Sequence, residues 1–330
     1  MRRRNIIGLV AGLVLISGRS ATFAAPDRVR RVTVLFPMPK SDPYFTENER
    51  VLREALRKYG WEEGKNLALT FASVGSDPVE IEKALPEILQ PEPDIIVSRS
   101  TAVALALRRR PQQTPVVFLQ VSDPVAQGIV ATMQNPGGTM TGFTVLEPSV
   151  GGKWVELLRE IAPEVKRIAF LQHGASSPVS VALAEAIEQG SRSLGLEPLI
   201  VPLRERADLE PAFERLSALN AVGLLVAPGA FTLENRSLIT ALAARYRIPA
   251  VYPFRYFVVA GGLASYGSEE VVWFQQAGDY VNRILHGAKP GDLPIQGPNR
   301  LSFILNADVA DDLGLIITPA LLARADEIID

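Results

Sequence analysis

Polar side chains that can bind a small ligand follow two apolar segments in the first half of the sequence. Ser100 and Thr101 come shortly after the run DIIVS, and Ser122 and Asp123 come shortly after PVVFLQ. Hydroxyl groups and free backbone N–H groups at the start of a helix suit a carboxylate, and an aspartate can bind an amine or a sugar hydroxyl. Two alternatives stay open: Ser100 and Thr101 as helix caps alone, and Asp123 as a turn residue before proline.

The second half of the sequence offers a similar set of side chains. His173 and Ser177 follow the apolar run RIAFL, and Gly229 and Phe231 follow VGLLVA. The serine precedes an expected helix and could hold an acidic group. The histidine could exchange a hydrogen bond with a ligand, and the phenylalanine could stack on a ring. A solvent-facing histidine and an ordinary core phenylalanine are the alternatives.

Four aromatic or hydroxyl residues complete the candidate binding site. Tyr44 follows the apolar run RVTVLF, and Phe254 follows the run AVYP. Thr144 and Tyr266 stand at the ends of two similar passages, where the chain is expected to cross from one half of the molecule to the other. A tyrosine at such a crossing can form the wall of a cleft and donate a hydrogen bond.

The sequence lacks the residue patterns of an enzyme. It contains no cysteine, which excludes a disulfide framework, a thiolate nucleophile and a cysteine-ligated metal. His173 and His286 are its two histidines and lie far apart, so no zinc site is expected. No G-x-G-x-x-G turn follows the first apolar run, and neither a P-loop nor a G-x-S-x-G elbow is present. We therefore expect a binding protein without catalytic residues, metal or cofactor; an exported enzyme is the weaker alternative.

Strands that alternate with helices must position these side chains. Between Arg31 and Gln120, apolar runs of strand length alternate with segments of helical periodicity. Strands that are apolar throughout are typical of a parallel sheet with helices on both faces. The pattern then restarts near Gly152, and three pairs of segments correspond at a nearly constant offset: 32–35 with 168–171, 95–98 with 224–227, and Pro115 with Pro249. The sequence thus predicts an α/β fold of two doubly wound parallel-sheet lobes of Rossmann-like type.

The two lobes are expected to exchange segments through a multi-strand hinge. We predict an N-terminal lobe of residues 26–143 and 268–290, and a C-terminal lobe of residues 144–267 and 291–330. The passages 114–143 and 248–267, each predicted as strand, loop and strand, close their lobes. The segments 233–246 and 319–329 are each predicted to form one helix. Ligands of open parallel sheets bind beyond the carboxyl ends of the strands, so the candidate residues should line the cleft between the lobes.

Residues 1–24 have the pattern of a signal peptide. Three consecutive arginines precede an apolar stretch of 11 residues, which is too short to span a bilayer comfortably. Ordinary secretion and the twin-arginine route are both compatible with it, and a membrane anchor is the alternative. Without this segment, which holds four arginines and no acidic residue, the formal charge changes from −2 to −6. Nucleic acid is therefore not an expected partner.

Several longer stretches resemble one family of binding proteins. PVVFLQVSDPVAQGIV, NPGGTMTGFT, IPAVYPFRYFVVAGGLASYG and LGLIITPALLARADEIID are similar to the ABC transporter substrate-binding family that includes TrpX-type proteins. The resemblance runs in order from Arg31 to the C-terminus. It implies the type I periplasmic binding protein architecture and a periplasmic monomer. Such a monomer closes on a small solute and docks to an ABC permease with a cytoplasmic ATPase.

The resemblance also bears on the ligand. TrpX-type members bind an aromatic amino acid and resemble this chain at Ser100-Thr101, Ser122-Asp123-Pro124 and Thr144. Where those members tend to have an Asp-Asn pair that suits an ammonium group, this chain has Pro228-Gly229-Ala230-Phe231. An amino acid, an aromatic compound or another carboxylate is therefore the expected class of ligand. A periplasmic sensing module of a signalling system is the alternative to an importer.

Overall fold

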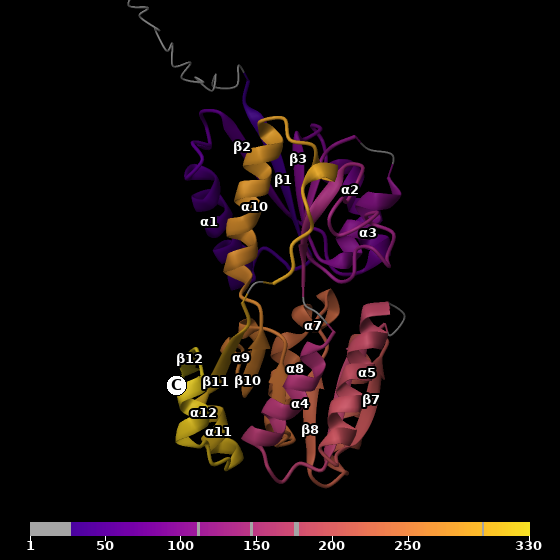
Figure 1. Cartoon of the computed structure of the whole chain (residues 1–330), viewed down its shortest axis with the longest axis vertical. Coiled ribbons are helices and arrows are strands. Elements are labelled where there is room, and N and C mark those ends of the chain that lie inside the picture. The colour runs from indigo at the N-terminus through magenta and orange to yellow at the C-terminus, as the bar shows by residue number, and fades with distance from the viewer. Residues whose placement is uncertain (1–27, 111–112, 146–147, 175–177, 299) are drawn as a thin grey trace, which may run out of the picture.

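The computed structural model describes residues 28–110, 113–145, 148–174, 178–298 and 300–330. The expected signal peptide and Ser177 lie outside these residues. Within them, the strands form two sheets, one in each half of an elongated molecule (Figure 1). No helix among the described residues is both long and apolar enough to cross a membrane.

The first sheet is parallel throughout and has the strand order β2-β1-β3-β4-β5. Helices α1 and α10 lie on one side of it and α2 and α3 on the other (Figure 1). All five residues of β3 are buried, as expected for a strand covered on both faces. The elements of this lobe are β1 (Arg30–Phe36), α1 (Pro43–Arg57), β2 (Leu67–Ser73), α2 (Pro78–Ile88), β3 (Ile95–Arg99), α3 (Thr101–Arg109), β4 (Val116–Val121), β5 (Met140–Thr144), α10 (Glu270–Leu285) and the 3₁₀ turn η2 (Pro290–Asp292).

The second sheet repeats this order and extends it. Strands β7-β6-β8-β9-β10 correspond to β2-β1-β3-β4-β5, and β11 and β12 follow at the β10 edge, with β11 antiparallel to β10. The predicted α/β fold of two doubly wound units is thereby confirmed. The elements of this lobe are α4 (Val150–Ile161), β6 (Arg167–His173), α5 (Pro178–Ser193), β7 (Glu197–Leu203), η1 (Arg206–Asp208), α6 (Leu209–Ser217), β8 (Val222–Val226), α7 (Ala230–Glu234), α8 (Arg236–Arg245), β9 (Ala250–Tyr252), α9 (Arg255–Val259), β10 (Ala264–Gly267), β11 (Ser302–Asn306), α11 (Ala307–Leu313), α12 (Pro319–Arg324) and β12 (Glu327–Ile329).

The chain passes between the sheets after β5, after β10 and before β11. At the first two crossings, the Ser268 hydroxyl donates to the Val145 carbonyl at 3.1 Å. Before the third, residues 293–296 run beside β5: the Thr141 hydroxyl donates to the Leu293 carbonyl at 2.7 Å, and Ile295 packs in the core of the first lobe. The boundary expected at residue 290 places this strip in the C-terminal lobe, whereas these contacts lie with the N-terminal lobe.

Three local predictions were wrong. The predicted helix 319–329 ends at Arg324, and Glu327–Ile329 instead pairs with β11 as the parallel strand β12, because the edge of β11 offers unpaired backbone groups. The predicted helix 233–246 is divided at Asn235, whose side chain binds the Phe231 carbonyl and the Arg206 guanidinium. The predicted loop within 248–267 contains the short helix α9.

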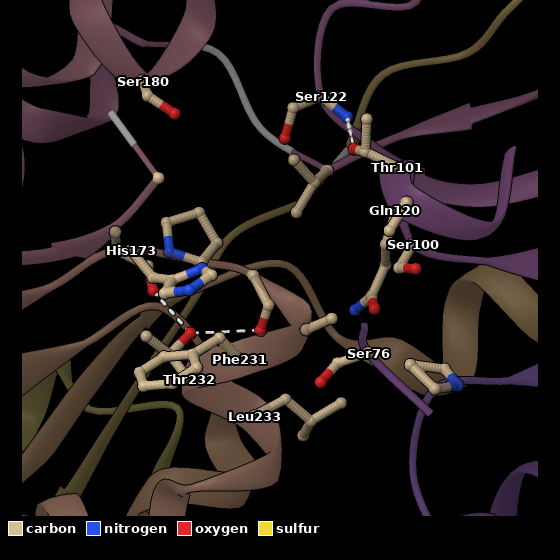
Figure 2. Close-up of a pocket in the computed structure, with 18 of the residues that line it drawn as sticks. Ser76, Ser100, Thr101, Gln120, Ser122, His173, Ser180, Phe231, Thr232 and Leu233 are labelled. Carbon is tan, nitrogen blue, oxygen red and sulfur yellow. Dashed lines mark hydrogen bonds between the residues drawn. The ribbon is translucent and has the colours of Figure 1, made fainter. Parts of the chain in front are cut away.

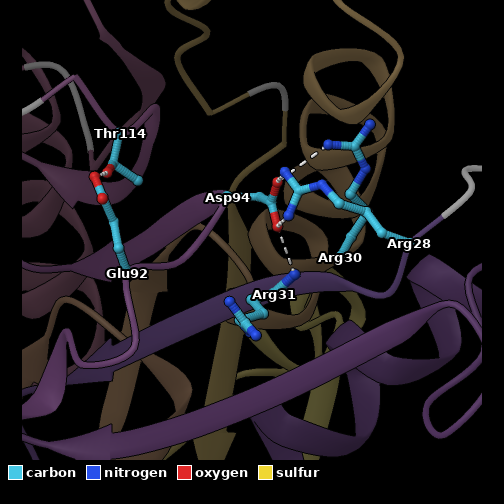
Figure 3. A network of polar contacts seen from close by, with 6 residues as sticks. All are labelled: Arg28, Arg30, Arg31, Glu92, Asp94 and Thr114. Atoms are coloured by element: carbon cyan, nitrogen blue, oxygen red, sulfur yellow. Dashed lines mark hydrogen bonds and ion pairs between the residues drawn. The ribbon is translucent and has the colours of Figure 1, made fainter.

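A carboxylate at the start of β3 ties β1 to the sheet (Figure 3). Asp94 accepts hydrogen bonds from the Arg31 backbone N–H at 2.9 Å and from the guanidinium groups of Arg28 and Arg30. Burial favours the neutral carboxyl, but the Arg31 N–H and the two guanidinium groups outweigh it and hold the pKa of Asp94 below its usual value.

We predict that Asp94→Asn destabilises the protein by about 1 kcal/mol at neutral pH, since it removes charge-assisted hydrogen bonds that are partly exposed to solvent. A lowered pKa in the folded state gives stability that is present above the unfolded pKa of about 3.9 and is lost as pH falls through the lower folded value. The difference in urea midpoint between wild type and variant should therefore shrink from pH 7 towards about pH 2. A difference that does not change with pH would contradict this role.

Candidate ligand-binding cleft

A cleft of about 470 Å³ lies between the two lobes. Its walls come from the residues that follow β3 and β4 in one lobe and β6 and β8 in the other (Figure 2). These are the carboxyl ends of parallel strands, where the sequence predicts ligand binding. The structure places seven of the predicted site residues in its lining: Ser100, Thr101, Ser122, His173, Gly229, Phe231 and Phe254.

The other predicted site residues that the structure describes lie outside this lining. Asp123 has a positive φ of 40°, and its carboxylate accepts from the Ala126 N–H at 3.0 Å, as in a turn. Thr144 is buried, and its hydroxyl faces the Gln296 carbonyl at 3.4 Å. Tyr266 lines a separate pocket beside Arg324, and Tyr44 lines another, beside Glu269. The two crossing residues therefore lie near the hinge and not against the cleft.

The wall from the N-terminal lobe is built from strained backbone and hydroxyl groups. Ser100 and Gln120 both have positive φ, 85° and 55°, a conformation that is costly for these residues and is concentrated at functional sites. Ser100 caps α3 by accepting from the Val103 N–H. The Thr101 hydroxyl oxygen accepts from the Ser122 N–H at 3.0 Å, so the hydroxyl proton can be donated elsewhere (Figure 2).

A buried arginine stands behind this wall. Arg99 ends β3, is 1% exposed, and donates through Nε to Gln120 Oε1 at 2.7 Å. Gln120, whose Oε1 accepts this bond, itself lines the cleft and so links the buried Arg99 to the cleft wall. Burial lowers the pKa of Arg99 to about 10, against the opposing effect of the neighbouring Tyr256. The guanidinium therefore stays charged at neutral pH.

The wall from the C-terminal lobe is aromatic. The rings of His173 and Phe231 stack at 4.2 Å with an angle of 8° between their planes. Nε2 of His173 lies 3.0 Å from the Arg204 carbonyl oxygen, which can only accept, so Nε2 carries the proton in this contact. Phe254 and Tyr256 add a second pair of rings at 5.2 Å. This wall can hold a flat apolar group by stacking.

Sequence reasoning missed three residues that shape the site. Arg99 is a charged residue at the end of an apolar strand, and Gln120 is the polar end of PVVFLQ. The sequence shows both residues as polar ends of apolar strands. Their hydrogen bond, however, depends on β3 and β4 being neighbours in the sheet. Tyr256 was hidden in a segment predicted to be a loop. No group of three or more acidic or histidine residues suited to a metal ion occurs among the described residues.

The chain matches the model of the family described as ABC transporter substrate binding protein over residues 36–329. It belongs to this family. It is 22% identical over 263 residues to a tyrosine-binding protein of Clostridioides difficile, covering 79% of this chain and 75% of that protein.

Two solved structures are similar over 91% of this substrate-binding protein and the whole of the other chain. A conserved domain protein from Vibrio cholerae has 26% identity and a TM-score of 0.82. An ABC domain in complex with L-Trp from Streptococcus pneumonia has 20% identity and a TM-score of 0.82. The fold is that of the type I periplasmic binding proteins. The family is one of substrate-binding proteins, and two of these relatives are described as binding tyrosine or as a complex with L-Trp.

The two lobes of this substrate-binding protein touch beside the cleft. Arg236, at the start of α8, forms an ion pair with Asp42 at 2.7 Å, and both side chains are almost completely buried. The Ser76 hydroxyl donates to the Glu234 carboxylate, and the rings of Tyr44 and Tyr256 meet edge to face at 5.5 Å. Each contact joins a residue of the first lobe to one of the second.

Proposed function

We propose that this chain is the periplasmic solute-binding protein of an ABC importer and that it binds a small carboxylate with a flat apolar body. The arrangement that carries the proposal is a row of hydrogen-bond donors on one wall of the cleft, opposite a stacked pair of rings on the other. The carboxylate would lie at Thr101, Gln120 and Ser122, and the ring would lie at His173 and Phe231. The cleft volume of about 470 Å³ suits a ligand of this size.

Charge supports an anionic ligand. The buried charged side chains around Arg99 include two guanidinium groups, Arg99 of the first lobe and Arg236 of the second, and one carboxylate, Asp42. Their surplus positive charge acts through a region of low dielectric, where it favours a nearby anion more than it would in water. The N-terminus of α3, a helix of nine residues, adds positive potential at Thr101.

Neither acidic residue in the cleft lining is well suited to bind an ammonium group. These residues are Asp77 and Glu205. Asp77 accepts from the backbone N–H groups of Val79 and Glu80 and so caps α2, and Glu205 is exposed to solvent. The relatives described as binding tyrosine and L-Trp support an aromatic body for the ligand. The proposed ligand has such an aromatic body and a carboxylate, and it does not need an α-amino group.

Export and partners belong to the same proposal. The arginine-rich apolar segment at residues 1–24 supports export to the periplasm, and membership of the family supports an ABC permease with its ATPase as the partner of a monomeric receptor. The proposed lobe boundaries are those predicted from the sequence, with residues 291–296 moved to the N-terminal lobe because of their contacts with β5.

A thermal-shift panel of four compounds tests the proposed ligand class. The compounds are 3-phenylpropionate, which has ring and carboxylate; L-phenylalanine, which adds the ammonium; phenethylamine, which has the ammonium alone; and glucose. We expect 3-phenylpropionate to raise the melting temperature at least as much as L-phenylalanine, and phenethylamine and glucose to have no effect. Stabilisation by glucose or by phenethylamine alone would overturn the proposal.

We predict that Phe231→Ala weakens binding of 3-phenylpropionate by about tenfold, since the loss of one stacked ring wall removes about 1.5 kcal/mol of apolar contact. Isothermal titration calorimetry measures the effect. Tyr59→Ala is the control, because the ring of Tyr59 is 44% exposed on the surface and lines none of the cleft. Equal affinity of wild type and Phe231→Ala would show that the ring does not form the ligand wall.

A further inference from the structure

A second cavity, of about 420 Å³, lies beside the crossing segments. Its lining comes from the start of α1 in the first lobe, from α9, β11 and the turn before β12 in the second, and from the links between the lobes at Ser268-Glu269 and Arg300. These elements lie on one side of the molecule, away from α3 and α5 (Figure 1). Tyr256 lines both this cavity and the ligand-binding cleft, so the two are neighbours.

Two buried side-chain atoms in this lining, Tyr44 Oη and Asn48 Nδ2, lack a hydrogen-bond partner among the described residues. Asn48 is 1% exposed, and its Nδ2 amide has no acceptor. A buried N–H₂ group without an acceptor is costly, and folded proteins satisfy nearly all such groups. Asn48 stands on the first turns of α1 facing the cavity, so an acceptor can be supplied by whatever occupies the cavity.

The charges of the lining are unevenly matched. Both of its arginines are paired, Arg255 with Glu327 and Arg300 with Asp326. Two further carboxylates remain. Glu47 pairs with Arg50 on the exposed face of α1, whereas Glu269 accepts a hydrogen bond from the Ser302 hydroxyl and attracts Arg300, which is itself paired with Asp326. The lining therefore carries a surplus of negative charge, centred on Glu269, and favours a cation.

We propose that this cavity is a second binding site, for a small organic cation that also carries an oxygen acceptor. The ammonium group pairs with Glu269, the acceptor oxygen receives the Nδ2–H of Asn48, and the apolar body lies against Val271 and Ile304. The ligand therefore needs a positive charge, which Glu269 in the link after β10 binds, and an oxygen acceptor, which Asn48 on α1 binds. The site is independent of the proposed carboxylate ligand of the cleft.

L-Leucinamide is a suitable probe, because it has an ammonium group, an amide carbonyl and a branched apolar body. 4-Methylpentanamide is its matched control, since it lacks only the ammonium. Calorimetry with the mature chain should detect binding of L-leucinamide and none of 4-methylpentanamide. Glu269→Gln and Asn48→Leu should each weaken binding of L-leucinamide at least tenfold, and the remote Glu210→Gln should leave it unchanged. Glu269 is partly exposed, so its variant tests the site even if Asn48→Leu fails to fold.

The cleft variant Phe231→Ala separates the two sites. L-Leucinamide should bind this variant as it binds wild type, and 3-phenylpropionate should still bind Glu269→Gln. The proposal is overturned if wild type does not bind L-leucinamide, if Glu269→Gln binds it as tightly as wild type, or if Phe231→Ala abolishes its binding. In the last case the probe occupies the ligand-binding cleft. L-Phenylalanine has both an ammonium group and an acceptor and can also enter this cavity, whereas 3-phenylpropionate has no ammonium. The proposed function is therefore tested by 3-phenylpropionate and this site by L-leucinamide, so failure of the one and failure of the other remain distinguishable.

Discussion

Replacement of Asp42 by asparagine will weaken ligand binding about 100-fold while leaving each lobe folded. The variant keeps an oxygen to cap α1 through the Tyr44 N–H, 2.9 Å away, but leaves the buried Arg236 guanidinium without its carboxylate. Removing one partner of a buried ion pair costs about 3 kcal/mol or more, which corresponds to about 100-fold in an equilibrium constant. The lobes can avoid this cost by moving apart, which returns Arg236 to water. The free-energy cost therefore destabilises the closed arrangement and lowers ligand affinity, and it does not destabilise the individual lobes.

Two measurements check this result. Calorimetry gives the loss of affinity for 3-phenylpropionate, and the radius of gyration from small-angle scattering of the ligand-free protein should be larger for Asp42→Asn than for wild type. The double variant Asp42→Asn with Arg236→Met removes both charges and should bind more tightly than Asp42→Asn alone. Arg245→Met breaks the exposed pair with Glu210 and should change little. If Asp42→Asn and Arg245→Met behave alike, the ion pair does not hold the lobes together.

The sequence was most informative where local chemistry and burial agree. The starts of α1 and α2 follow from Asp42-Pro43 and Asp77-Pro78, each a capping carboxylate before a proline that suits the first turn. Strands such as β3 and β8, buried along their whole length, could be recognised because both faces are covered by helices. The order of the repeated units fixed which residues follow strands, and so predicted seven residues of the cleft lining.

The misplaced elements depend on contacts between distant segments. Helix periodicity in 319–329 continues past Arg324, but the pairing of β12 with β11 and the hydrogen bond from the Phe303 N–H to Asp326 end the helix there. After Arg255, helix α9 consists of aromatic and β-branched residues with weak helix propensity, and the burial of Tyr256, Phe257 and Val258 stabilises it. Propensity alone cannot include either effect.

Contacts between distant segments also explain why some predicted site residues lie outside the cleft lining and why others were not predicted. Thr144 and Tyr266 lie at the ends of β5 and β10, but the direction in which each side chain points depends on how three segments pack at the hinge. The Thr144 N–H and hydroxyl both face the Gln296 carbonyl, 152 residues away. The Arg99 to Gln120 hydrogen bond likewise needs two neighbouring strands in register, Arg99 opposite Leu119. Such pairs come from topology and are not encoded in local pattern.

Gly267→Ala will destabilise the protein by about 3 kcal/mol or more, because a methyl group at this position has no space. A Cβ added to Gly267 would lie 1.8 Å from the Pro253 carbonyl oxygen, which belongs to the backbone and cannot rotate away. Strand β10 cannot shift to relieve the clash, since β9 and β11 hold it on both sides. A glycine of β5 in the first lobe, Gly142, would likewise place a Cβ 1.9 Å from the Phe118 carbonyl oxygen. The same close approach therefore occurs where each lobe leads into the hinge.

Gly152→Ala is the matched control, because a Cβ there meets nothing within 4 Å and the residue lies in α4. An alanine in a helix is favoured over glycine, so this variant should be more stable by about 0.5–1 kcal/mol. Urea unfolding followed by circular dichroism should therefore move the midpoint in opposite directions for the two alanine variants. Two similar midpoints would mean that the close approach of β10 to Pro253 is not rigid. The glycines at the two crossings would then serve hinge motion and not packing, and Gly267→Ala would alter ligand affinity without altering stability.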